Sequence, residues 1–310
     1  MKIEYIKHRF RKSTLAVVHD CNVIVSEYQA QGYTMTLRGI YYQMIARDLF
    51  PSDWIDVAYN AKHGLDRMTK NTPKNYKRFG QTISKARKAG LTSWYAMEDV
   101  TRSLRGVNHW DTPEDMIASA IGSYKKDKWR NQPKRVEVWI EKEALINIIG
   151  RTCRELDVDF FACRGYGSDT AYWNASQRFR RYAKKGQKTF VIYLTDHDPS
   201  GIDMARDLRD RLKLFRTPSA TVQRVALTME QIERYSPPPN PAKTTDSRAA
   251  GYIRKFGRDS WELDALTPDV MNDLITRSVL AHRDEFLWKE MVADENADIA
   301  QLRSMIEQDD

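Results

Sequence analysis

Three carboxylates stand where two strands of a sheet would end. Asp196 and Asp198 come just after the apolar run KTFVIYL, and Glu141 follows the strand-like run RVEVWI. Sites in open parallel sheets form beyond the carboxyl ends of the strands, so these side chains meet if the two strands are neighbours. Carboxylates held together repel one another unless a cation joins them, and Mg²⁺ prefers such oxygen ligands. The spacing therefore predicts a magnesium site, whose ion would offset negative charge on a phosphate oxygen or a leaving group.

The same residues also have a structural interpretation. Asp198 precedes Pro199 and the helical run SGIDMARDL, so its side chain would cap that helix. His197, between the two aspartates, is interpreted as a spacer. The spacing alone leaves the metal site and the helix cap open as alternatives.

The acids belong to a segment in which strand-like and helical runs alternate. The strand-like runs are 135–141, 158–163, 188–196 and 221–227, and the helical runs between them are 143–156, 169–186 and 199–215. This alternation predicts a parallel sheet with crossover helices. A Pro-rich loop follows at 236–251, and the pattern after it is helical. We interpret WELDALTPDVMNDLI (261–275) as purely structural, a strand end or linker that leads into a helix.

The N-terminal part has a different, mainly helical pattern. Helical runs at 13–32, 36–50 and 72–91 precede a short aromatic run at 92–98 that we interpret as a strand. Ser13 is the expected N-cap of the first run. Helices followed by a strand are typical of a helix-turn-helix or winged-helix module. We therefore expect an α/β protein: a winged-helix DNA-binding domain at 1–105, a connector with one helix at 106–133, and a parallel-sheet domain with C-terminal helices at 134–310.

A tyrosine with an arginine one helical turn before it lies in the second helical run. Arg38 and Tyr42 share a helix face, whereas Tyr41 falls on the apolar side and is expected in the core. Arg binds phosphate well. A phenol has a pKa near 10, so it attacks phosphorus efficiently only when a nearby cation activates it. Two adjacent tyrosines on a helix are also ordinary packing residues. We expect Tyr42 to be the more exposed ring.

Positive charge is concentrated in the N-terminal part. Residues 1–130 hold 22 Lys and Arg against 13 Asp and Glu, while the remainder is nearly balanced. The helical run at 72–91 is basic and contains no acid, and its apolar side is formed by Tyr76, Phe79 and Ile83. Such a helix contacts DNA phosphates, or else simply presents a charged face to solvent. The candidate DNA-binding residues are Lys74, Lys77, Arg78, Lys85, Arg87 and Lys88.

Composition excludes several classes of protein. No apolar run is long enough for a transmembrane helix, and the N-terminal run MKIEYIKHRFRKS has no apolar signal core. The three cysteines match no zinc pattern and are an odd number, which argues against a disulfide framework. We expect a cytoplasmic protein without membrane contact. Association with the nucleoid of a bacterium or of a phage-infected host cell is implied only by the family resemblance that the following motifs carry.

Four short motifs together resemble one family of DNA-breaking enzymes. The chain contains RGIYY at 38–42, EKEA at 141–144, GY at 165–166 and DHDPSGID at 196–203. They are similar to motifs in the A subunit of topoisomerase VI, a type IIB topoisomerase, whose acidic domain has the Toprim fold. Two positions differ from the family pattern: Gly39 replaces a common acidic residue, and GYGSDT replaces G-Y-P-D. The short stand-alone relatives called mini-A, found on phages and plasmids, are the most similar in size.

The resemblance implies a mechanism and an assembly. Residues 134–310 would be a Toprim domain that holds Mg²⁺ on Glu141, Asp196 and Asp198. Tyr42 would be the nucleophile that links covalently to double-stranded DNA, with Arg38 as its phosphate partner. A homodimer is implied, in which the tyrosine of one protomer meets the acids of the other. The chain has no G-x-x-x-x-G-K-[ST] motif, so ATP-driven strand passage would need a separate ATPase subunit of the GHKL type.

Two alternatives remain open. A Toprim nuclease would hydrolyse DNA with metal-activated water, and Tyr42 would then be structural. A catalytically silent protein would bind DNA and cut none.

Overall fold

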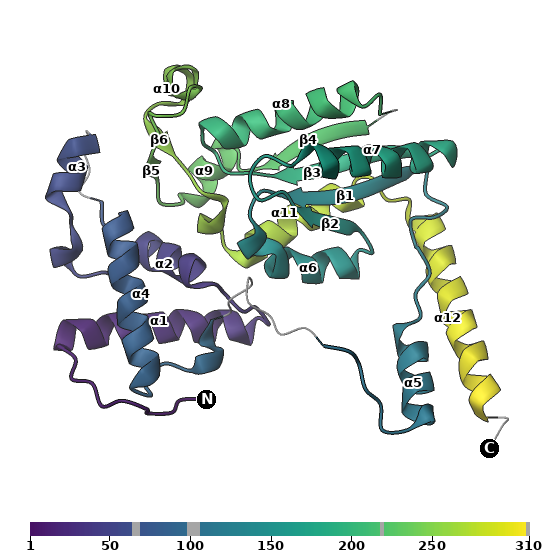
Figure 1. The fold of residues 1–310 in the computed structure, drawn as a ribbon, viewed down its shortest axis with the longest axis horizontal. Helices are drawn as coiled ribbons and strands as arrows, with labels where there is room; N and C mark the ends of the chain where they lie inside the picture. The colour runs from purple at the N-terminus through teal and green to yellow at the C-terminus, as the bar shows by residue number, and fades with distance from the viewer. Residues whose placement is uncertain (64–68, 98–105, 218–219, 308–310) are drawn as a thin grey trace.

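The chain forms a group of N-terminal helices, a parallel sheet covered by helices on both faces, and an outlying helix pair (Figure 1). This computed structural model describes residues 1–63, 69–97, 106–217 and 220–307. None of the helices within these ranges is long and apolar enough to cross a membrane. The three cysteines are free and buried.

The sheet has four parallel strands in the order β2-β1-β3-β4. Their bounds are β1 (Lys134–Ile140), β2 (Asp159–Ala162), β3 (Lys188–Leu194) and β4 (Ala220–Ala226). The predicted parallel sheet with crossover helices is confirmed. Because β1 and β3 are neighbours, with Ile140 opposite Leu194, the residues that follow both strands emerge at one edge.

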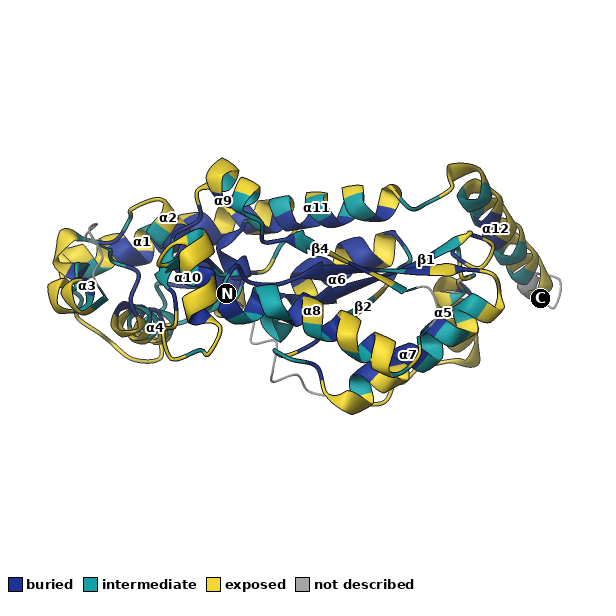
Figure 2. Cartoon of the chain, turned by 90° about the horizontal axis from the view of Figure 1, so that it is seen from above, coloured by how far each residue is buried: buried dark blue, intermediate teal, exposed yellow. Residues whose placement is uncertain are grey.

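Alternating side chains of the strands pack against helices on opposite faces. Helices α7 (Asp169–Lys184) and α8 (Pro199–Leu214) cover one face, and α6 (Ile146–Glu155) and α11 (Pro268–Leu280) cover the other. Trp139 and Tyr193 point into the first layer, and Val138 and Ile192 into the second. Figure 2 shows buried strands beneath helices whose outer sides are exposed. This double-sided core holds the strand ends in fixed positions.

The N-terminal group contains α1 (Lys12–Ala30), α2 (Leu37–Ala46), α3 (Val57–His63) and α4 (Pro73–Lys88). Three of these helices were predicted, and α3 was not. The prediction of Ser13 as an N-cap is wrong, because α1 begins before it and Arg11 takes the cap position. The predicted apolar side of α4 is confirmed: Phe79 and Ile83 are buried and Tyr76 is half-buried.

The predicted strand at 92–98 is wrong over its described residues. Trp94–Ala96 form a 3-10 turn, and Met97 makes only an isolated bridge to Met35. A wing needs two paired strands, and residues 1–63 and 69–97 form none; residues 98–105 lie outside the described part. The helical architecture stands, whereas the winged-helix assignment stays a prediction.

The remaining elements frame the sheet. The connector holds one helix, α5 (Pro113–Ser123), as predicted, and α5 lies beside α12 (Glu285–Glu307), away from the sheet. A short antiparallel pair, β5 (Asn240–Pro241) and β6 (Asp259–Ser260), brackets α10 (Ala249–Phe256). Helix α9 (Met229–Tyr235) precedes this pair, and the 3-10 turn η4 (Leu263–Ala265) follows it. The β5–β6 pair lies between the N-terminal helices and the sheet (Figure 1), and η4 packs against α2.

Candidate active site

The carboxyl edge of the sheet brings Glu141 and Asp196 into contact. Glu141 follows β1 directly, and its Oε2 accepts a hydrogen bond of 2.9 Å from the backbone N–H of Asp196. Asp196 is buried. The two acids that sequence spacing placed at neighbouring strand ends therefore meet at this edge.

Asp198 serves as the N-cap of α8. Its Oδ1 accepts hydrogen bonds from the backbone N–H of Gly201 at 2.6 Å and from the Ser200 hydroxyl at 3.1 Å. The helix-cap interpretation is thus correct for this residue. Asp198 also lines a cavity together with Asp196, so capping does not remove it from the site.

Lys142 lies among three carboxylates. Its Nζ is 3.1 Å from Asp196, 2.7 Å from Glu262 and 2.8 Å from Asp264. Sequence analysis did not predict a role for Lys142. It also interpreted the segment WELDAL, which contains Glu262 and Asp264, as purely structural. The signal was the spacing, since Glu262 and Asp264 repeat the acid-x-acid pattern of Asp196 and Asp198 after a short strand.

Burial and mutual repulsion perturb the acids. Burial raises the pKa of Asp196 well above its ordinary value, opposed by Lys142 and reinforced by Glu141. Burial also raises the pKa of Glu141. Burial would lower the pKa of Lys142, but Asp264 and Asp196 outweigh it, so this pKa is raised well above its ordinary value. Burial is therefore the main cause of both raised carboxyl pKa values, and Lys142 stays charged among these acids.

The donor chemistry of this cluster suits a hard divalent cation. The atoms of this cluster that could ligate a metal are all carboxylate oxygens. One of them, the buried Oδ2 of Asp264, has no hydrogen-bond partner among the described residues. In the arrangement present, however, no group of three His, Cys, Asp or Glu is placed to hold a metal ion within the described ranges. Because the Lys142 ammonium lies against Asp196, an ion at this edge would have to displace it.

The loop of Glu262 is fixed to the loop of Asp196 by its backbone. His197 and Trp261 exchange backbone hydrogen bonds of 2.8 and 3.0 Å, and the N–H of Leu263 donates to Asp196 Oδ1 at 2.8 Å. The His197 ring is buried against the Tyr252 hydroxyl at 2.9 Å. Burial and Arg224 lower the pKa of His197 to about 4, so the ring is neutral and has a packing role, as a spacer would.

Tyr42 is buried: its ring is slightly the more exposed of the two tyrosines, as expected, but it does not reach the surface. Its exposed fraction is 4%, against 2% for Tyr41. Tyr41 packs in the helical core, as expected, while the other side of α2 is covered by the β5–β6 pair and by Glu262. The Tyr42 hydroxyl lies 3.5 Å from Asn240 Nδ2. Burial raises the pKa of Tyr42, and Glu262 adds to this rise.

Comparison with protein-family models and with curated proteins found no match. The functional argument therefore depends on the residues themselves.

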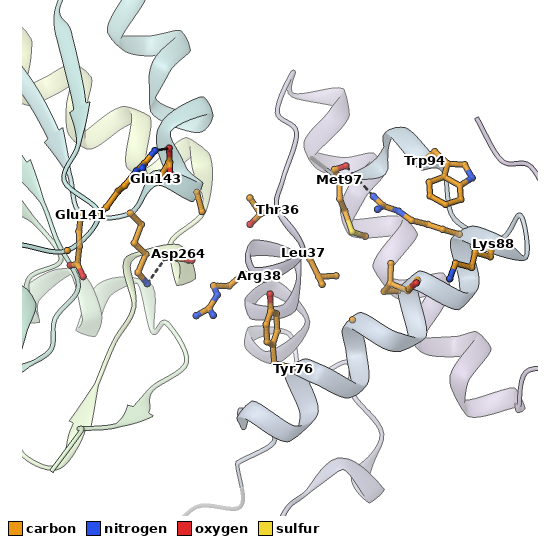
Figure 3. A pocket seen from close by; sticks show the side chains of 18 residues that line it. Thr36, Leu37, Arg38, Tyr76, Lys88, Trp94, Met97, Glu141, Glu143 and Asp264 are labelled. Carbon is orange, nitrogen blue, oxygen red and sulfur yellow. Dashed lines mark hydrogen bonds and ion pairs between the residues drawn. The ribbon is translucent and has the colours of Figure 1, made fainter. Parts of the chain in front are cut away.

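Arg38 points from α2 across a cleft toward the sheet edge (Figure 3). Its Nη1 lies 3.1 Å from Glu262, and its guanidinium lies over the Tyr76 ring at 5.1 Å. The cleft, about 970 Å³ in volume, is lined by Glu141 and Asp264 on one side and by Arg38, Tyr76 and the end of α4 on the other. We call it the basic–acidic cleft.

The candidate DNA-binding residues of α4 fall into two groups. Lys77, Lys85 and Lys88 are exposed. Lys74 pairs with Asp56 at 3.3 Å, and Arg78 pairs with Asp53 at 3.2 Å and stacks on Trp54. Arg87 lines the basic–acidic cleft and donates to the carbonyl of Met97 at 3.2 Å. Lys77, Lys85 and Lys88, which are exposed and form no ion pair among the described residues, are therefore the side chains best placed for a polyanion.

Gly201 is required at the start of α8, because a Cβ there would lie 2.3 Å from the carbonyl oxygen of Asp196. We expect Gly201→Ala to displace the Asp196 loop and to lower the free energy of unfolding by about 1–3 kcal/mol. Gly251→Ala is the matched control, since a Cβ in that helix meets nothing within 4 Å. Urea unfolding of both variants is the measurement. Equal stability of the two variants would contradict the tight packing inferred for this loop.

Proposed function

We propose that this protein breaks DNA by magnesium-dependent transesterification through Tyr42, in the manner of a type IIB topoisomerase A subunit with a Toprim domain. One observation carries the proposal: Tyr42 and Arg38 line the same cavity as Asp196 and Asp198, although these two pairs of residues are far apart in the sequence. The cavity has a volume of about 440 Å³, and we call it the tyrosine cavity. A nucleophile, a phosphate-binding guanidinium and a set of acids are the parts that this reaction needs.

In the proposed step, the Tyr42 oxygen forms a bond to a backbone phosphorus and the bond from that phosphorus to a sugar oxygen breaks. The leaving sugar oxygen takes up a proton, and Tyr42 loses one. We assign Glu262 as the acceptor of this proton: burial would raise its pKa, but the charges of Lys142 and Arg38 outweigh burial and lower the pKa, so the carboxylate is ionised. Glu141, Asp196 and Asp198 would hold Mg²⁺, which when bound supplies positive charge beside the phosphate.

The contacts of Arg38 and Tyr42 must change when a phosphate enters. Arg38 is paired with Glu262, and Tyr42 is covered by Asn240. A phosphate is a better bidentate partner for Arg38 than the single contact that Glu262 supplies. We infer that DNA exchanges with Glu262 on Arg38 and thereby exposes the Tyr42 hydroxyl.

The test of this function uses the wild-type chain with supercoiled plasmid and either Mg²⁺ or Mn²⁺. After the incubation, detergent should trap nicked or linear DNA that carries covalently bound protein. Protease should then remove the protein and leave nicked or linear DNA. Intact plasmid under every metal condition would contradict the proposal and favour a silent DNA-binding protein.

Hydrolysis by a Toprim nuclease is the second candidate, and the burial of Tyr42 favours it. A buried phenol with a raised pKa is a poor nucleophile until the cavity opens. A nuclease needs only the acidic edge and water. Broken DNA with free ends and no attached protein would identify this reaction.

Duplex DNA is the proposed partner, and we expect α4 to contact its phosphates. Replacing Lys77, Lys85 and Lys88 together by Ala should weaken binding and reduce the slope of log K against log salt by roughly 0.9 for each lysine that contacts a phosphate. Fluorescence anisotropy across a salt series measures this slope. Lys184, Lys185 and Lys188 form a matched triple-Ala control, because they are exposed and lie at the amino-terminal edge of the sheet.

A salt-independent affinity of the wild type, or equal losses in the two triple variants, would contradict the phosphate contacts of α4. The homodimer and a separate ATPase subunit follow from the resemblance alone and stay predictions.

A further inference from the structure

Three aromatic side chains are exposed on the N-terminal helical group. The exposed fractions of Trp94, Tyr95 and Tyr5 are 40%, 70% and 65%. Trp94 and Tyr95 are adjacent in the 3-10 turn, and the Tyr5 ring meets the Trp94 ring edge to face, with the centroids 6.0 Å apart. Exposed apolar side chains that lie singly are ordinary, whereas a contiguous group marks a binding surface. We call these three residues the aromatic group.

Backbone contacts hold the aromatic group in place. The N–H of Tyr5 donates to the carbonyl of Lys88 at 2.8 Å. The N–H of Tyr95 donates to the Ser93 hydroxyl at 3.2 Å, and the side chain of Gln29 donates to the Tyr95 carbonyl at 2.9 Å. Because the backbone beneath the rings is fixed, a ligand that stacks on them would cost little conformational entropy.

The surroundings of Trp94 are cationic. The Arg87 guanidinium lies over the Trp94 ring at 5.9 Å. Arg87 pairs with no acid among the described residues, and its buried Nε has no hydrogen-bond partner there. Lys88, the next residue, is exposed. Protein interfaces are depleted in lysine, whereas sites for single-stranded nucleic acid combine aromatic rings with cations, so this surface suits a nucleic acid better than a protein.

The aromatic group is continuous with the basic–acidic cleft. Trp94 lines that cleft together with Arg38 and Glu141, and Figure 3 shows Trp94 at the end away from Glu141. Between Tyr76 and Lys88, which both line the cleft, α4 advances about 18 Å at 1.5 Å per residue. Stacked nucleotides advance by about 3.4 Å each, so a strand with one phosphate at Arg38 would reach Trp94 within about five nucleotides.

We propose that Trp94, with Tyr5 and Tyr95 beside it, is a stacking site for unpaired bases of a DNA strand. This inference rests on the proposed function, because it takes DNA as the partner. Bases inside a duplex already stack on one another, so the site selects DNA that has a gap, a flap or a melted stretch beside the break. Stacking tolerates any sequence, since every base has a π-face.

Two oligonucleotides separate stacking from phosphate contacts. Fluorescence anisotropy compares a labelled oligo-dT strand of about 15 nucleotides with an abasic strand of the same length, which keeps the phosphates and lacks the bases. The wild type should bind oligo-dT roughly 5- to 100-fold more tightly than the abasic strand. Trp94→Ala should lose most of this preference, and Trp94→Phe, which keeps a ring, should retain most of it. Trp110→Ala is the matched control, because Trp110 is 41% exposed and lies in the connector.

Equal affinity of the wild type for the two oligonucleotides would overturn the stacking site. An unchanged preference in Trp94→Ala, or equal losses of affinity for both strands in that variant, would also overturn it. These affinities are measured without cleavage. A wild type that cuts plasmid but shows no preference for bases keeps the proposed function and loses the stacking site, and one that prefers bases but never cuts DNA does the reverse.

Discussion

Tyr42→Phe is expected to lower covalent protein–DNA adduct formation by more than about 10³-fold, since it removes the attacking oxygen. The ring keeps its place in the core, and the lost hydroxyl makes a long contact of 3.5 Å with Asn240. The fold should therefore survive. Gel electrophoresis of labelled DNA in detergent measures the adduct, and circular dichroism checks the fold.

Tyr76→Phe is the matched control for this substitution. Tyr76 lines the same tyrosine cavity, and its ring, which lies under Arg38, is retained. We expect adduct formation close to that of the wild type. If Tyr42→Phe forms as much adduct as the control, the nucleophile is another residue. If Tyr42→Phe cuts DNA as well as the wild type but neither forms an adduct, the protein is a nuclease.

Lys142→Met is expected to lower the free energy of unfolding at neutral pH by about 3–5 kcal/mol, because it leaves buried carboxylates without their cation. Asp196 and Asp264 are buried, and Lys142 is within 3.1 Å of the first and 2.8 Å of the second. Methionine keeps much of the length of the side chain and removes only the charge. Urea unfolding followed by tryptophan fluorescence measures the change.

Two controls separate the loss of this cation from a general effect of the substitution. Lys74→Met removes an exposed ion pair to Asp56 and should leave stability nearly unchanged. Millimolar Mg²⁺ should stabilise Lys142→Met more than the wild type, because the ion replaces the ammonium at the acids. Unchanged stability of Lys142→Met would show that the acids of this edge do not depend on Lys142.

Sequence periodicity predicted the sheet because each strand and helix forms its pattern locally. The apolar runs at 135–141 and 188–196 are buried on both faces, and the helices between them have one apolar side, so their order predicts parallel pairing. The contact of Glu141 with Asp196 followed from the same reasoning, since strand ends at one edge are close. The 3-10 turn at Trp94–Ala96 was missed because an aromatic run of this length suits a turn or a strand equally.

The surroundings of Tyr42 could not be predicted in this way. Helical periodicity distinguishes the side of α2 that faces α1 and α4, and it places Tyr41 there. The other side is covered by Glu262, which lies 224 residues from Arg38 in sequence and reaches it only through docking of the two parts. Lys142 was missed for a related reason: its three carboxylates come from two separate loops, and only the fold unites them.

Mapping the attachment site in the trapped adduct tests the central claim most directly. Wild-type protein is incubated with plasmid and Mg²⁺, the adduct is denatured, and the DNA and protein are digested with nuclease and trypsin. We predict that the nucleotide remnant is on the peptide GIYYQMIAR, residues 39–47, and that fragmentation assigns it to Tyr42. A remnant on any other residue, or cut DNA whose ends carry no peptide, would contradict the account.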